Sequence, residues 1–163
     1  MSSLRLGSIA PDFEAQTTAG PIKPNWERPP VAHPNFVVRD VKLIGLSASG
    51  LDNHEKWIKD INEYGSNTVS PTEVQFPSIA DAYRKISAFY DMLDVVDATN
   101  VDSKGIPSTV RTVFLIDPKK VIRLTISYPA RTGRNFDEIL RAIDSIQLGD
   151  MYKPYLRFAR SPF

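Results

Sequence analysis

Residues 110–128 read VRTVFLIDPKKVIRLTISY, and this stretch decides the fold. The run from Val110 to Ile116 is almost continuously apolar with one charge, Arg111, which is typical of a buried strand. The DPKK that follows places Asp and Pro at the first two positions of a type I turn. Residues 121–128 then alternate apolar and polar side chains, so the two runs predict an antiparallel hairpin. The apolar members of the second strand are expected on one face: Ile122, Leu124, Ile126 and Tyr128.

Amphipathic helices are predicted on both sides of this hairpin. After it, residues 135–149 are expected to form a helix with Asn135 as N-cap and Gly149 as its end. Its apolar stripe consists of Phe136, Ile139, Leu140, Ile143 and Ile146. Before it, a helix is predicted from Asp81 to Leu93. The apolar face of this helix consists of Ile86, Phe89, Tyr90 and Leu93.

A strand–helix unit is predicted closer to the N-terminus. Val41–Leu46, VKLIGL, is short, apolar and β-branched, and therefore indicates a buried strand. In the helix that follows, Asp52 is expected to cap with Glu55 in capping-box position, and Gly65 is expected to end it. The order strand, helix, helix, hairpin, helix predicts an α/β fold with a mixed sheet flanked by helices.

Composition excludes several classes of function. The chain has 163 residues, a net charge of +1 and no cysteine, so one soluble domain is expected, without disulfides, thiolate metal sites or a thiol nucleophile. The two histidines have no metal-ligand spacing, and we expect neither a metal nor a cofactor. No basic patch predicts nucleic-acid binding, and no run is long enough for a membrane span. The N-terminal stretch MSSLRLGSIAPDF has no long apolar segment, so a cytoplasmic protein is expected.

Several stretches, in order along the chain, resemble the 1-Cys peroxiredoxins of the peroxiredoxin-6-like branch. They are LRLGSIAPDFEAQTTAGPIK, RDVKLIGLSASGLDNHEKWIKDINEY, FPSIADAYRKISAFYDMLD and the long match VRTVFLIDPKKVIRLTISYPARTGRNFDEILRAIDSIQL. The resemblance implies a thioredoxin-like fold and an antioxidant family that reduces hydrogen peroxide and organic or lipid hydroperoxides with thiols. In that family a cysteine thiolate at a helix N-terminus, in a motif P-x-x-x-T-x-x-C, attacks the peroxide and becomes a sulfenic acid.

That motif is missing from this chain. The family's interval with the strand, the threonine and the cysteine is reduced here to PNWERPPVAHPNFVV, residues 24–38, and the shortening lies near residues 24–34. The resemblance therefore implies that a central strand between VKLIGL and VRTVFLI has been lost. Three outcomes are expected as alternatives. The two flanking strands pair directly with each other, or NFVVRDV shifts to take the place of the lost strand, or the domain is incomplete and weakly stable. On this interpretation residues 1–149 are a shortened peroxiredoxin domain, and residues 150–163 are a remnant of the family's C-terminal domain.

Two arginines are the candidate site residues. Arg111 matches the family arginine that binds peroxide and stabilises the thiolate, and Arg134 matches a second family arginine near the site. The alternative for both is a solvated or paired arginine at the start of a strand or helix. Ser47 and Thr109 are weak candidates for replacement nucleophiles because neither has a base in a triad pattern, and His33 is expected in a loop. ERPP is too short a match to predict a polyproline ligand.

Three functions remain open on the sequence. The first is a peroxiredoxin-family protein whose peroxidase activity is lost or nearly lost because no cysteine can be oxidised. The second is a non-catalytic interaction protein that forms a homodimer, or pairs with a full-length relative, through the edge strand Val121–Tyr128. The third is a non-functional truncation that the cell degrades. The family also includes mitochondrial members, so a mitochondrial location is an alternative to the cytoplasm.

Overall fold

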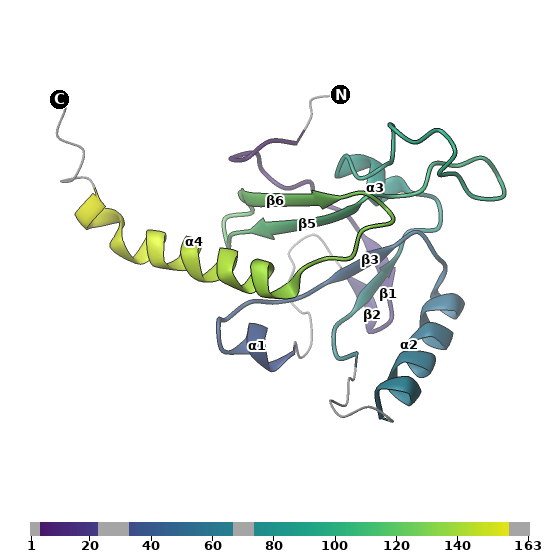
Figure 1. Cartoon of the computed structure of the whole chain (residues 1–163), viewed down its shortest axis with the longest axis horizontal. Coiled ribbons are helices and arrows are strands. Elements are labelled where there is room, and N and C mark those ends of the chain that lie inside the picture. Colours follow the sequence, from purple (N-terminus) through teal and green to yellow (C-terminus); the bar gives the residue numbers. More distant parts are fainter. Residues whose placement is uncertain (1–3, 23–32, 67–73, 157–163) are drawn as a thin grey trace.

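The computed structural model describes residues 4–22, 33–66 and 74–156. Its elements follow one another as β1 (Ala15–Thr17), β2 (Gly20–Ile22), α1 (Pro34–Val37), β3 (Gly45–Ser47), α2 (Leu51–Ser66), β4 (Ser78–Ala80), α3 (Lys85–Phe89), β5 (Arg111–Ile116), β6 (Ile122–Tyr128) and α4 (Phe136–Leu156). Helices and strands therefore mix along the chain, as predicted, and Figure 1 shows the helices placed around the strands.

The predicted hairpin is confirmed. β5 and β6 pair antiparallel from Arg111 opposite Tyr128 to Ile116 opposite Ile122. Asp117 organises the turn, because its carboxylate accepts the backbone N–H groups of Lys119 and Val121, each at 2.9 Å. Its carbonyl accepts the N–H of Lys120 at 2.8 Å, which closes the turn.

One detail of this hairpin differs from the prediction. The register shifts by one residue at Leu115/Ile116, so a bulge separates Ile122 from Leu124. Ile122 packs in one hydrophobic cluster and Ile126 in the other. The expectation that all four apolar residues of β6 share a face is therefore wrong, because a bulge exchanges the faces of a strand.

The remaining strands form a separate mixed sheet in the order β2-β1-β4-β3. β3 and β4 are parallel, whereas β1 pairs antiparallel with β2 and with β4. No backbone hydrogen bond joins β3 to β5 among the residues the structure describes. The α/β thioredoxin-like arrangement is thus present, but its sheet is divided at the position where a strand was expected to be missing.

Two hydrophobic clusters lie on opposite faces of these strands. The first contains Ile79, Ile86, Tyr90 and Ile122, and the second contains Phe36, Ile139 and Ile143. Successive side chains of the segments on either side of the divided sheet pack on one cluster and then on the other. Ile44, Leu46, Phe114 and Ile116 pack on the first cluster, and Val41, Leu43, Val113 and Leu115 pack on the second. Segments 41–46 and 113–116 are therefore held in one layer by side-chain packing on both faces, although their backbones are not paired.

The helices depart from prediction at their ends. α2 begins at Leu51, so Asp52 is its second residue and not its cap, and the helix passes Gly65 to end at Ser66. α4 passes Gly149 and ends at Leu156, beyond an ion pair in which Arg123 donates two bonds to Asp150 at 2.8 and 2.9 Å. The cap at Asn135 is confirmed, since its side chain accepts the N–H of Glu138 at 3.1 Å. The assignment of residues 150–163 to a second domain stays a prediction.

The helix predicted from Asp81 to Leu93 is mostly absent. α3 spans only Lys85–Phe89, because residues 81–84 form a turn in which Arg84 adopts a left-handed conformation with φ of 55°. The buried carboxylate of Asp81 accepts the N–H of Ile86 at 3.3 Å, and it accepts the N–H and the hydroxyl of Ser87 at 2.7 Å each. A side chain that bonds to nearby backbone competes with a continuous helix.

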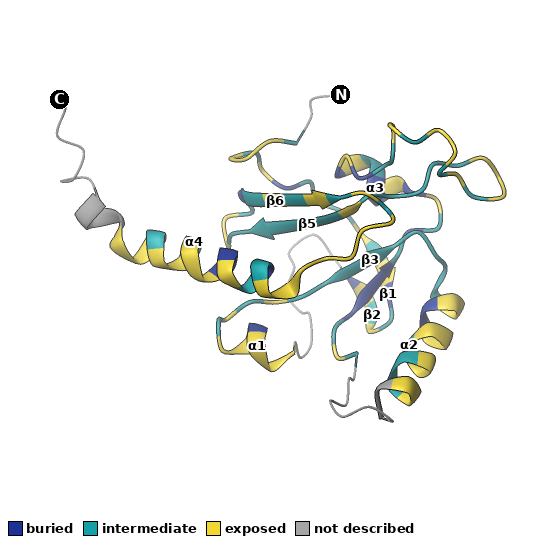
Figure 2. Cartoon of the chain, in the orientation of Figure 1, coloured by how far each residue is buried: buried dark blue, intermediate teal, exposed yellow. Residues whose placement is uncertain are grey.

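Phe36, Val37 and Val38 do not replace the missing strand. The first two lie in α1, a single helical turn preceded by His33, whose Nδ1 accepts the N–H of Asn35 at 3.3 Å. Phe36 is buried under α4, whereas Val37 and Val38 are 55% and 78% exposed. Figure 2 shows the part of α1 nearest α4 as buried and the rest of this turn as exposed. The stretch therefore covers one face of the strands and adds no strand to the sheet.

We predict that Asp81→Ala lowers the free energy of unfolding by about 3 kcal/mol, because it leaves three buried donors without an acceptor. Urea denaturation followed by circular dichroism measures this change. Asp60→Asn, an exposed change on α2, is the matched control and should alter stability by less than about 0.5 kcal/mol. A loss below about 1 kcal/mol for Asp81→Ala would contradict the role given to this carboxylate.

Candidate functional site

Arg111 lies at one end of the hairpin, as the first residue of β5. Its side chain is exposed, and its Nε donates a 2.6 Å hydrogen bond to the carbonyl oxygen of Ala130. Ala130 belongs to the loop that joins β6 to α4, where Thr132 donates to the carbonyl of Pro129 at 2.9 Å. The hydrogen bond therefore attaches the start of β5 to this loop.

Arg134 comes from the same loop, one residue before the cap of α4. Burial lowers the pKa of its guanidinium, and the positive charge of Arg111 lowers that pKa further. Much of the Arg134 side chain remains exposed, so it is covered on one side only. Arg134 thus lies in the loop to which Arg111 is hydrogen-bonded, although 23 positions separate the two arginines; their catalytic role stays a prediction.

Among the residues described, these two guanidiniums have no carboxylate partner, and the same holds for Arg5 and Arg131. Arg39, Arg84, Arg123 and Arg141 each form an ion pair with a carboxylate. Within the described ranges, neither Arg111 nor Arg134 forms an ion pair. The site is therefore a pair of like charges without a counter-charge from the chain described.

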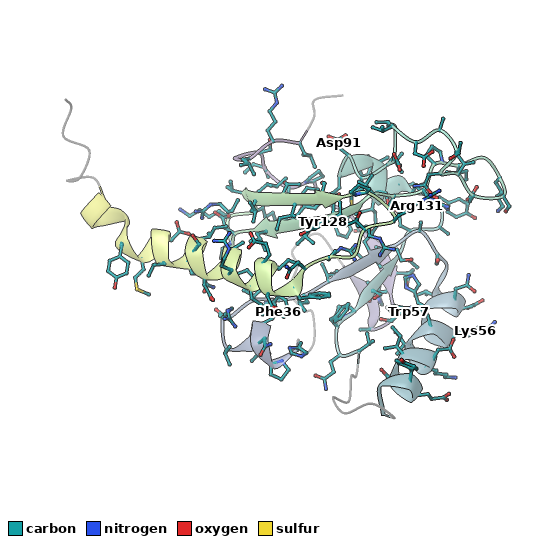
Figure 3. All side chains as sticks on the ribbon, in the orientation of Figure 1. Phe36, Lys56, Trp57, Asp91, Tyr128 and Arg131 are labelled. Atoms are coloured by element: carbon teal, nitrogen blue, oxygen red, sulfur yellow. The ribbon has the colours of Figure 1, made fainter. Side chains whose placement is uncertain are left out.

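A third arginine of this loop was not singled out from the sequence. Hydrogen bonds from Thr99 lower the pKa of the Asp97 carboxyl, and the positive charge of Arg131 lowers this pKa further. Figure 3 labels Arg131 and Tyr128 near this end of the hairpin. The repeated arginine in RTGR, on both sides of a glycine, is the signal that could have identified a cationic loop.

The other candidate residues do not form a catalytic arrangement. Ser47 ends β3, and Thr109 forms an isolated bridge with Leu93. No hydrogen bond within the described segments joins either hydroxyl to a histidine or a carboxylate. His54 is buried on α2, and both of its ring nitrogens lack a hydrogen-bond partner. None of these residues therefore has the base or acid that nucleophilic catalysis requires.

The described part of the chain contains neither a cluster of metal ligands nor a helix suited to a membrane. No group of three or more histidine, aspartate or glutamate residues gathers there closely enough to hold a metal ion. None of the helices described has both the length and the apolar surface needed to cross a membrane. Arg111 and Arg134 therefore remain the candidate site residues.

Comparison with known proteins identifies the relatives of this chain. Residues 30–125 match the model of the AhpC/TSA family. Human peroxiredoxin-6 is 42% identical over 170 residues, which cover 89% of this chain and 74% of that protein. Peroxiredoxin PRX1, mitochondrial, from Saccharomyces cerevisiae is 41% identical, and the match spans 90% of this chain but only 64% of the yeast protein. Peroxiredoxin 6 of Arenicola marina, solved as a cysteine-to-serine mutant, superposes with a TM-score of 0.75 at 34% identity, covering 91% of this chain and 76% of that one.

The length of the human match reveals residues that this chain lacks. It spans 170 aligned positions, whereas 89% of 163 residues is about 145, so about 25 positions have no residue of this chain. A strand with most of a helix has about this size, since strands average about 5–6 residues and helices about 11–12, and connecting loops add a few more. The identities, the coverage and the shared architecture together show that this chain, although it contains no cysteine, belongs to the AhpC/TSA family as a peroxiredoxin-6-like, 1-Cys-type homologue.

Proposed function

We propose that this chain is a peroxiredoxin homologue without thiol peroxidase activity. The observation that supports the proposal is the absence of cysteine from all 163 residues. Peroxide reduction of this kind requires a thiolate that attacks one peroxide oxygen, so that sulfur is oxidised to a sulfenic acid as the O–O bond breaks. A guanidinium can donate hydrogen bonds to a peroxide, but it has no electron pair with which to replace that thiolate.

We predict no catalytic turnover of hydrogen peroxide or of an organic hydroperoxide in the presence of dithiothreitol. The measurement is peroxide consumption per mole of chain, with an active peroxiredoxin as positive control and the denatured chain as background. The three methionines set a limit on non-catalytic consumption, since each can take up one oxygen atom to become a sulfoxide. Sustained consumption beyond three equivalents per chain, above the denatured background, would overturn the proposal.

Dimerisation through β6 is the second proposed property. The start of this strand is already paired on its outer side, because Gly7 donates to the carbonyl of Ile122 at 2.8 Å and Ile122 donates to that of Ser8 at 2.9 Å. From Arg123 to Tyr128 no strand pairs with the outer edge in the part of the chain the structure describes. Unpaired strand edges bind other strands, and a second copy in antiparallel orientation would form a symmetric interface. The proposed edge is therefore shorter than the predicted Val121–Tyr128.

We predict that Thr125→Lys weakens this dimer, because a two-fold axis near the middle of the open edge would bring two added charges together. Thr125 is exposed, so the change leaves the hydrophobic clusters intact. Sedimentation velocity at micromolar concentration should show a dimer for the original chain and a larger monomer fraction for the variant. Ser103→Lys, in an exposed turn, is the matched control and should leave the dimer unchanged. A monomeric original chain, or equal behaviour of both variants, would remove this interface.

Pairing with a full-length peroxiredoxin through the same edge is the alternative partner. Co-purification with a tagged relative distinguishes this partner from self-association, and Thr125→Lys should reduce it as well. The yeast relative is named as mitochondrial; a cytoplasmic or mitochondrial location for this chain stays a prediction.

A further inference from the structure

β3 has a free backbone edge, because it is the end strand of the sheet formed by the residues described. Its bonds to β4 use alternate residues: Gly45 donates to the carbonyl of Pro77 at 2.8 Å, and the carbonyl of Ser47 accepts the N–H of Asp81 at 2.9 Å. Successive residues of a strand point their backbone groups to opposite edges. The N–H and C=O of Leu46, between these two residues, therefore point away from β4.

β5 also has a free edge, on the side opposite β6. Thr112 lies directly across from Ser127, and their hydroxyl oxygens are 3.1 Å apart. The N–H of Thr112 donates to the carbonyl of Val110 at 3.2 Å, so this N–H is not bonded to β6. Because alternate residues of a strand share an orientation, the N–H and C=O of Phe114 also point away from β6.

Side-chain packing places these two free edges in one layer. Leu46 and Phe114 pack on the first hydrophobic cluster, and Leu43 and Val113 pack on the second. The division between β3 and β5 therefore has backbone donors and acceptors on both sides and apolar side chains on both faces. These are the surroundings of a central strand. The side chains of β3 and of residues 112–116 in β5 are only half-buried, so the layer is incompletely covered there.

We propose that the division between β3 and β5 binds one extended peptide strand, supplied by another chain, with apolar side chains on both of its faces. An inserted strand would bond to Leu46 on one side and to Phe114 on the other, and it would satisfy backbone groups that are costly to leave unpaired. The comparison with human peroxiredoxin-6 indicates which peptide has this character. About 25 aligned positions of that protein have no residue here, enough for a strand and most of a helix. The occupant is therefore this unmatched segment of a relative, added as a separate peptide.

Fluorescence anisotropy of a labelled synthetic peptide tests this site. The peptide contains the unmatched residues of human peroxiredoxin-6, with any cysteine replaced by serine so that it forms no disulfide. We expect saturable binding with a dissociation constant below about 100 μM. A peptide of the same composition in scrambled order should bind at least about tenfold more weakly, because its apolar residues no longer alternate to match the two clusters.

Thr112→Pro and Ser127→Pro are matched variants on opposite edges of the hairpin. Each removes one partner of the same hydroxyl contact, and each replaces an N–H that points away from the other strand of the hairpin. Proline has no N–H to donate and is tolerated at a free strand edge. Thr112→Pro should weaken peptide binding at least about tenfold, whereas Ser127→Pro, on the outer edge, should change it less than about threefold. Circular dichroism establishes that both variants fold.

Hydrogen exchange of the unaltered chain decides the case even if a variant fails to fold. Bound peptide should slow exchange of the Leu46 and Phe114 amides at least about tenfold and leave the Ser127 amide unchanged. Absence of saturable binding up to ~1 mM peptide, equal binding of the scrambled peptide, or protection of Ser127 instead would overturn the proposal. Peptide binding that weakens as the chain concentration rises would also overturn it, since a second copy of this chain would then fill the division. None of these readouts involves peroxide, so this inference can fail while the proposed loss of peroxidase activity stands.

Discussion

Every strand has two edges of backbone donors and acceptors, and β3 and β5 each pair on only one of them in the described structure. β3 is bonded to β4, and β5 is bonded to β6, with no hydrogen bond across the division between them. Unpaired backbone groups are costly when they are buried, so water must reach this division or the domain must be weakened by it. The apolar residues Val113, Phe114, Leu115 and Ile116 are accordingly only half-buried, although strands at the centre of such sheets are normally covered on both faces.

Side-chain packing, and not backbone pairing, therefore unites the two sheets. One cluster, under α3 and the N-terminal segment, receives Ile44 and Phe114; the other, under α1 and α4, receives Leu43 and Val113. Figure 1 shows α4 starting beside the hairpin and extending past it, and Figure 2 shows the buried part of α4 in its first half. The sheet is divided, and the chain contains no cysteine. Both features agree with the roughly 25 aligned positions of human peroxiredoxin-6 that have no residue here. The catalytic role that the resemblance implies for Arg111 and Arg134 stays a prediction.

Long, regular patterns in the sequence predicted their elements well. The hairpin, its Asp117 turn, the Asn135 cap and the body of α2 all follow from spacing and from the chemistry of single residues. β1, β2 and β4 have three residues each, too few to establish a period. α3 could not be delimited because Asp81 bonds to Ile86 and Ser87, a tertiary arrangement of a buried carboxylate that periodicity does not reveal. For the site, the resemblance named Arg111 and Arg134, but their proximity required the loop geometry at the end of β6.

Hydrogen exchange of the backbone amides from Arg111 to Ile116 tests the central claim, that a strand is missing beside β5. In a strand paired on one edge only, every second amide points to the partner and the others point away. We therefore predict alternation along β5, with amides bonded to β6 exchanging slowly and the intervening amides, which face β3, exchanging much faster. Uniform protection of all six residues would show that β5 is paired on both edges, and would contradict the account of a divided sheet.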